Sequence, residues 1–63
     1  MEGSAERHME KAIRHAAVAG ALRALARNEP EAARGLNRCA GKHSEYSAAF
    51  LAAVMESVGG ALP

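Results

Sequence analysis

Hydrophobic residues repeat along this chain at helical spacing and nowhere alternate as they would in a strand. In the second half, Ala32, Leu36, Phe50, Val54 and Val58 fall within an arc of about 80° when each residue is turned by 100°. Only four residues are β-branched and no two of them are adjacent: Ile13, Val18, Val54 and Val58. The pattern therefore predicts an all-α protein of one small domain spanning residues 1–63.

Capping and helix-breaking residues mark the first helix. Ser4 is a suitable N-cap and Glu6 places an acidic side chain in the first turn. Pro30 disfavours helical backbone angles at the residue before it. These signals predict a first helix over about residues 5–27.

The turn and the second helix follow from the next residues. Asn28 and Glu31 have the spacing of a capping pair, and Pro30 is tolerated in a first turn. We therefore expect a turn over 28–30 and a second helix over about 30–58. Three helix-ending residues follow: Gly59, Gly60 and Pro63.

Residues 41–44 raise the question of whether the second helix is broken. Gly41 could end one helix and Ser44 could cap another, which would give three helices. The apolar stripe keeps its phase across these residues, as one continuous helix requires. One long helix is favoured, and a kinked or broken one remains the alternative.

Two helices joined by a short turn form an antiparallel hairpin. We expect the large residues of the second helix to pack on Val18, Leu22 and Leu25 of the first. Those large residues are Leu36, Phe50, Leu51, Val54 and Val58.

Two helices alone cannot enclose a core. Between Ala16 and Ala26 the first helix is apolar nearly all round, with Arg23 as its only polar residue. This indicates a second contact face, used either in a homodimeric helical bundle or against a larger protein. Ala16, Gly20 and Ala24 recur every four residues, a spacing that allows close approach of helices within the hairpin or between chains.

Composition narrows the possible functions. The net charge of +1 is far below that of a dedicated nonspecific nucleic-acid binder, and no apolar run reaches the length of a membrane span. The single cysteine excludes an internal disulfide and suits a cytoplasmic location. The chain has no Asp and no glycine-rich phosphate loop, so we expect neither catalysis nor a cofactor.

Basic residues form two clusters at helical spacing. We expect them either to be solvated, to meet an acidic protein partner, or to contact nucleic acid. The clusters are Arg7, Lys11 and Arg14 on the first helix, and Arg34, Arg38 and Lys42 on the second. His8 and His15 lie among the first cluster and are expected to be solvated.

Cys39 and His43 are one turn apart and are the only candidate metal ligands. Two such pairs across a dimer would supply four ligands, which makes a metal-binding dimer a remote alternative.

Tyr46 and Met55 flank the apolar stripe of the second helix. Both residue types are favoured where a surface is buried on binding. We expect a recognition edge at Tyr46 and Met55 that continues onto Arg38 and Lys42. The sequence thus favours a non-catalytic interaction module: a regulator, inhibitor or assembly adaptor of the kind that phages and mobile elements carry. A helical dimer that binds RNA or DNA is the alternative.

Overall fold

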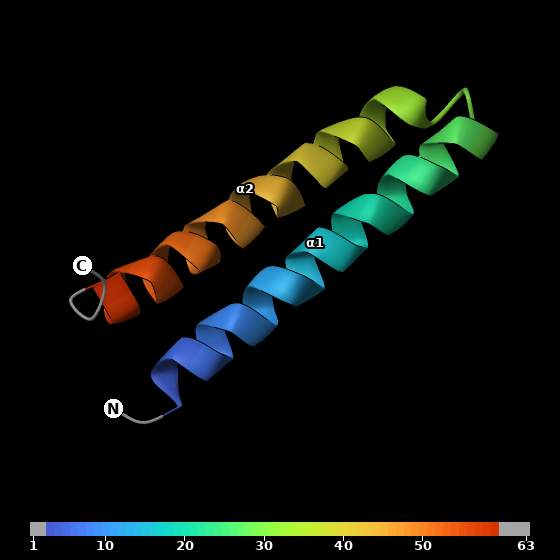
Figure 1. Cartoon of the computed structure of the whole chain (residues 1–63). Helices are drawn as coiled ribbons and strands as arrows, with labels where there is room; N and C mark the ends of the chain where they lie inside the picture. Colours follow the sequence, from blue (N-terminus) through green and yellow to red (C-terminus); the bar gives the residue numbers. More distant parts are fainter. Residues whose placement is uncertain (1–2, 60–63) are drawn as a thin grey trace.

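The computed structural model describes residues 3–59 as two antiparallel α-helices joined by a short turn (Figure 1). Helix α1 spans Ser4–Asn28 and helix α2 spans Ala33–Gly59. No strand occurs among the described residues. The expected all-α hairpin is therefore confirmed. The beginning of α1 and the end of α2 lie at the same end of the rod, and the turn lies at the other.

Helix α2 runs without interruption through residues 41–44. Gly41 and Ser44 both lie inside the helix, so neither ends nor begins one. The continuous phase of the apolar stripe was the correct guide, and the three-helix alternative is wrong.

The first helix begins one residue earlier than expected. Gly3 precedes it with a φ of +83°, a left-handed conformation that glycine adopts readily, and its carbonyl accepts the backbone N–H of Arg7 at 2.9 Å. No side chain caps this end. Ser4 is the first helical residue rather than the cap.

The turn is longer than expected and α2 begins three residues later. The backbone N–H of Ala32 bonds to the carbonyl of Glu29 at 3.0 Å, and that of Ala33 to Pro30 at 3.3 Å. These i to i+3 bonds form tight turns before regular helical bonding starts. The predicted Asn28–Glu31 capping pair is wrong, because Asn28 is the last residue of α1. Gly59 ends α2, and Gly60 and Pro63 lie outside the described residues.

The residues through which the helices meet are spaced alternately three and four apart, as in an antiparallel coiled coil. The α1 members are Ala5, His8, Ala12, His15, Ala19, Leu22 and Ala26, and the α2 members are Ala33, Leu36, Ala40, His43, Ser47, Phe50 and Val54. Buried positions are few among residues 3–59, and their side chains are small. They are Ala12, Ala19, Ala26, Ala40 and Val54.

The expected core on α1 is therefore mostly wrong. Val18 and Leu25 are 41% and 48% exposed, and only Leu22 is partly buried. On α2, Leu51 and Val58 are likewise exposed. The expectation followed side-chain size, whereas the helices meet through alanines that allow their backbones to approach closely.

The register between the helices also differs from the expected one. The Ser47 hydroxyl donates to the carbonyl oxygen of Ala12 at 2.7 Å, which sets these two residues level with each other. Phe50 consequently lies beside His8 and His15. It does not reach Val18, Leu22 or Leu25, which lie nearer the turn.

Neither helix, within residues 3–59, combines the length and the apolar character that crossing a bilayer requires.

Replacing Ala40 by leucine should destabilise the hairpin, because Ala40 is 0% exposed and the seam has no room for a larger side chain. We expect a loss of about 1–3 kcal/mol in the free energy of unfolding, measured by urea denaturation. Ala52→Leu, on the exposed outer face of α2, is the control and should change stability by less than about 0.5 kcal/mol. Equal losses of unfolding free energy in the two variants would contradict the close packing of Ala40 between the helices.

Candidate functional site

All five ring-bearing side chains other than proline lie next to one another along the contact between the helices, with Tyr46 at its exposed edge. We call His8, His15, His43, Tyr46 and Phe50 the ring cluster. Phe50 stacks on His15 with ring centres 5.7 Å apart and planes 4° apart, and it lies 5.9 Å from His8. Tyr46 presents its edge to His15 and His43 at 5.3 and 6.0 Å. The rings of the cluster alternate with the small residues along the contact between the helices.

A histidine pair lies at the centre of the cluster. The Nδ1 atoms of His15 and His43 are 2.8 Å apart and the rings are stacked with centres 5.0 Å apart. One ring must donate its N–H while the other accepts, so the two rings hold different tautomers when both are neutral. This is a specific polar contact in an otherwise apolar seam.

The expectation of solvated His8 and His15 is wrong, because both are partly buried against α2. Their seven-residue separation was the available signal. With Ala12, Ala19 and Leu22 between and beyond them, they complete the alternating three-and-four pattern. The contact face expected on α1, formed by Val18, Leu22 and Leu25, contains neither histidine.

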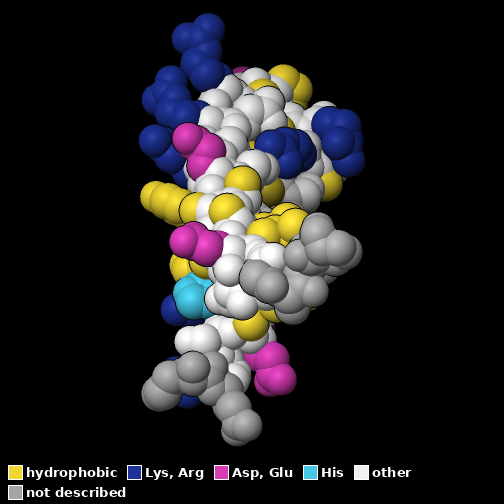
Figure 2. All heavy atoms as spheres, turned by 60° about the vertical axis from the view of Figure 1, so that its left-hand side comes forward, with side chains coloured by type: hydrophobic (Ala, Val, Ile, Leu, Met, Phe, Trp, Pro, Cys, Tyr) yellow, Lys and Arg dark blue, Asp and Glu magenta, His cyan; other side chains and the backbone are white. Residues whose placement is uncertain are grey.

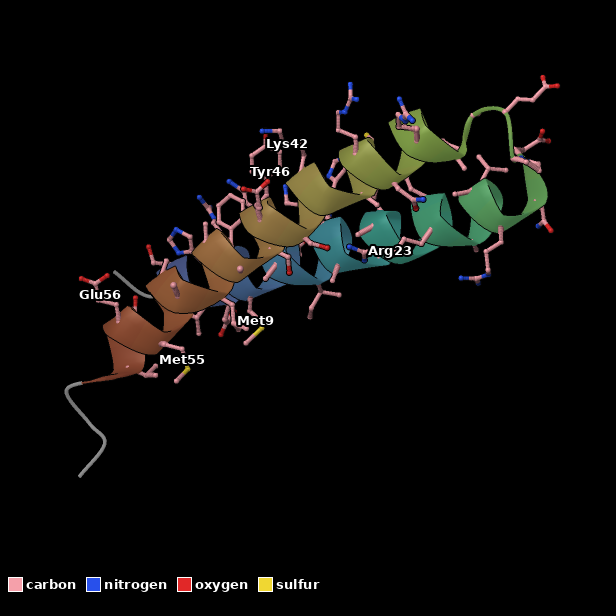
Figure 3. The ribbon with its side chains drawn as sticks, turned by 90° about the horizontal axis from the view of Figure 1, so that it is seen from above. Met9, Arg23, Lys42, Tyr46, Met55 and Glu56 are labelled. Atoms are coloured by element: carbon pink, nitrogen blue, oxygen red, sulfur yellow. The ribbon has the colours of Figure 1, made fainter. Side chains whose placement is uncertain are left out.

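One side of the hairpin is basic. The ammonium of Lys11 lies 5.4 Å from the centre of the Phe50 ring, within cation–π range. Arg7 and Arg14 share this face of α1 by their spacing, and Arg14 pairs with Glu10. Lys42 projects from α2 on the same side as Tyr46 (Figure 3). We call Arg7, Lys11, Arg14 and Lys42 the basic side.

The remaining predicted basic contacts are not on this side. Arg38 is on the outer face of α2, away from α1, and the spacing of Arg34 turns it toward the opposite side of the hairpin. In a view toward the open end of the hairpin, Lys and Arg side chains gather in the upper part, with hydrophobic side chains exposed among and below them (Figure 2). Arg34, Arg38 and Lys42 thus cross the outer face of α2 within an arc of about 80°, and only Lys42 reaches the basic side.

The opposite side of the hairpin is apolar near its open end. Met9, with Ile13 one turn further along α1, lies there close to the end of α2. The α2 residues of this side are Leu51, Met55 and Val58. We call these five residues the apolar side. Further toward the turn, the Arg23 guanidinium donates to the Ser44 hydroxyl at 2.9 Å.

The predicted recognition edge is not assembled as one surface. Met55 lies with Met9 on the apolar side, whereas Tyr46 and Lys42 project from the basic side (Figure 3). Tyr46 and Met55 flank the α2 stripe that faces α1, as the sequence predicted, but they lie on its two opposite flanks. The expectation that both flanks belong to one surface is therefore wrong.

The small residues predicted as a packing seam do not pack between the two helices. Ala16 and Gly20 are exposed, and Ala24 is partly buried. A Cβ atom added to Gly20 would meet nothing within 4 Å. Within the hairpin, the close approach uses Ala12, Ala19 and Ala26 instead.

The two candidate metal ligands, Cys39 and His43, lie in different environments. Cys39 is exposed, whereas His43 is partly buried and its Nδ1 atom is hydrogen-bonded with that of His15. Among residues 3–59, no three His, Cys or Glu side chains gather closely enough to hold a metal ion, and no pocket is present.

A scan against models of protein families and searches of curated proteins and of solved structures found no match to this chain. Its function is therefore inferred from the arrangement of its own side chains.

The histidine pair should show energetic coupling that other residues lack. In a double-mutant cycle of His15→Ala and His43→Ala, measured by urea unfolding, we expect a coupling of about 0.5–1.5 kcal/mol, the range for one hydrogen bond. The control cycle combines His43→Ala with Leu25→Ala, an exposed position near the turn, and should be additive within about 0.5 kcal/mol. Additivity in both cycles would contradict the His15–His43 contact.

Proposed function

We propose that this protein is a non-catalytic protein-interaction module that docks through its apolar side. The observation that supports this most is the inverted distribution of its hydrophobic residues. The helices bury four alanines and one valine, whereas eight larger hydrophobic side chains are 37–61% exposed. Five of these eight form the apolar side.

The composition of the apolar side suits recognition of another protein. Contiguous exposed apolar surface on a small protein commonly marks a binding site. Methionine is enriched in protein interfaces because its flexible side chain adapts to irregular surfaces. Met9 and Met55 supply this property, and Ile13 leaves 61% of its surface exposed to a partner.

Stability gives a second reason for a partner. An alanine seam buries little apolar area, and burial stabilises in proportion to that area. A partner that binds only the folded hairpin would raise its stability by mass action. A regulator, inhibitor or assembly adaptor in the cytoplasm, where the exposed Cys39 thiol would stay reduced, fits these properties.

Binding should depend on the apolar side and not on the basic side. We expect Ile13→Ser/Met55→Ser to weaken the capture of protein partners from an extract of the native cell by about tenfold or more. Both side chains are more than half exposed, so each change should alter folding stability by less than about 0.5 kcal/mol.

The matched control for this experiment is Arg7→Ser/Lys42→Ser, two exposed changes on the basic side. It should retain capture. Partners that bind the two double variants equally well would show that the apolar side is not the docking surface.

Nucleic-acid binding is the second candidate, favoured by the grouping of Arg7, Lys11, Arg14 and Lys42 on one side. If this side contacts phosphates, Lys42→Ala should lower the slope of log affinity against log salt by about one. If it does not, structured RNA and duplex DNA should bind no more tightly than about 10⁻⁶ M at physiological salt. Fluorescence anisotropy at several salt concentrations separates the two outcomes.

A further inference from the structure

The side of the hairpin that carries the five large apolar residues changes character along its length. Beyond those residues, its middle is lined by small side chains, and its turn end is basic. The small residues are Ala16, Gly20, Gly41 and Ala48, and the basic ones are Arg23, Arg27 and Arg34. Only one acidic residue of the described part has the spacing to lie on this side: Glu6, near the open end.

The two glycines are not explained by the hairpin itself. A Cβ atom added to Gly20 or to Gly41 would meet nothing within 4 Å. Both lie inside helices, where glycine is less favourable than alanine. They have the same position on their respective helices relative to the seam. Close approach of another helix from outside would account for both.

On α1, large and small residues of this side are arranged symmetrically about one point. The pairs Ile13 with Ala16 and Met9 with Gly20 share a midpoint between residues 14 and 15. A two-fold axis that crosses α1 there brings each large side chain opposite a small one of an antiparallel second copy.

The charged residues have the same symmetry. Glu6 and Arg23 are centred on the same point of α1, so the axis places Glu6 of each copy opposite Arg23 of the other.

Helix α2 gives an independent check on the position of the axis. Gly41 and Ala48, the small residues of this side on α2, are centred between residues 44 and 45. The hydrogen bond from Ser47 to Ala12 sets the register of the two helices and places this point level with the midpoint on α1. One axis therefore fits the small residues of both helices, and on α2 it places Met55 of each copy opposite Arg34 of the other.

We infer that the partner on the apolar side is a second copy of this chain, stacked antiparallel to form a four-helix bundle. The two-fold axis crosses α1 between Arg14 and His15 and runs perpendicular to the rod. This inference names the partner of the proposed interaction and rests on that proposal.

Charge selects this arrangement over the parallel one. In a parallel stack, the basic turn ends of the two copies would meet: Arg23, Arg27 and Arg34 of one copy would face their counterparts in the other. The antiparallel stack separates these clusters and pairs Arg23 with Glu6.

The area available is sufficient for a stable dimer. Standard interfaces bury about 800 Å² per partner, about one sixth of the 4868 Å² that this chain exposes. A side of a rod that measures 47 by 19 Å can supply such an area.

A charge swap tests the inference. By sedimentation equilibrium we expect a dimer at micromolar concentration that Glu6→Arg or Arg23→Glu weakens by about tenfold or more. The double swap Glu6→Arg/Arg23→Glu should restore the affinity to within about threefold of the original. Glu6 and Arg23 are about 25 Å apart along one straight helix, so restoration requires a second chain.

Two control variants complete the test. Glu10→Arg makes the same charge change on the outer face of α1 and should leave the dimer unchanged. Gly20→Leu should weaken the dimer by about tenfold or more, because it fills the space opposite Met9, whereas Ala17→Leu on the outer face should not. Circular dichroism at each concentration confirms that every variant is helical.

The outcomes separate this inference from the proposed function. A helical monomer at tens of micromolar overturns the second copy; if Ile13→Ser/Met55→Ser still abolishes capture of another protein, the proposed function stands. A dimer that the double swap does not restore overturns the arrangement. If neither Glu6→Arg nor Ile13→Ser/Met55→Ser weakens the dimer, the inference is wrong. If Ile13→Ser/Met55→Ser also leaves the capture of protein partners unchanged, the proposed function is wrong as well.

Discussion

The close approach of two helix backbones through alanines is the constraint on which the rest of this structure depends. Ala12, Ala19 and Ala26 recur every seven residues on α1 and are buried. On α2, Ala40 is completely buried against α1. Side chains this small allow the helices to approach closely, and most of the larger apolar residues lie on the flanks of the hairpin. The surface of the hairpin carries large apolar side chains because mostly small ones occupy the buried positions between the helices.

The ring cluster compensates where alanine alone would leave gaps. Flat rings stack in the narrow space between close helices, and the His15–His43 hydrogen bond gives that stacking a fixed partner. Ser47 adds a second directional contact by donating to the carbonyl of Ala12. These two polar contacts fix the register, which an alanine seam specifies weakly because one alanine can replace another at little cost. A polar group within a helical seam commonly serves this purpose.

How much of this the sequence could predict depends on what each inference rested on. The hairpin and the continuity of α2 followed from helix propensity, turn residues and the phase of the stripe, all of which are local. The buried face did not follow, because 16 of the 63 residues are alanine and size-based reasoning selected Val18 and Leu25 over Ala12 and Ala19. The histidine pair joins positions 28 residues apart, so predicting it requires the register between the two helices. That register could not be derived from the wrong face of α1.

The large side chains that lie outside the contact between the helices fall on two opposite flanks of the hairpin. Met9 and Met55 leave the seam on one flank, and Lys42 and Tyr46 leave it on the other. In a dimer joined through the apolar side, the two basic sides point away from each other, one on each outer face of the bundle. Each face would carry Lys11 beside the Phe50 ring and Tyr46 beside the His15 ring, so a ligand of the basic side would contact the neighbours of the histidine pair that fixes the helix register.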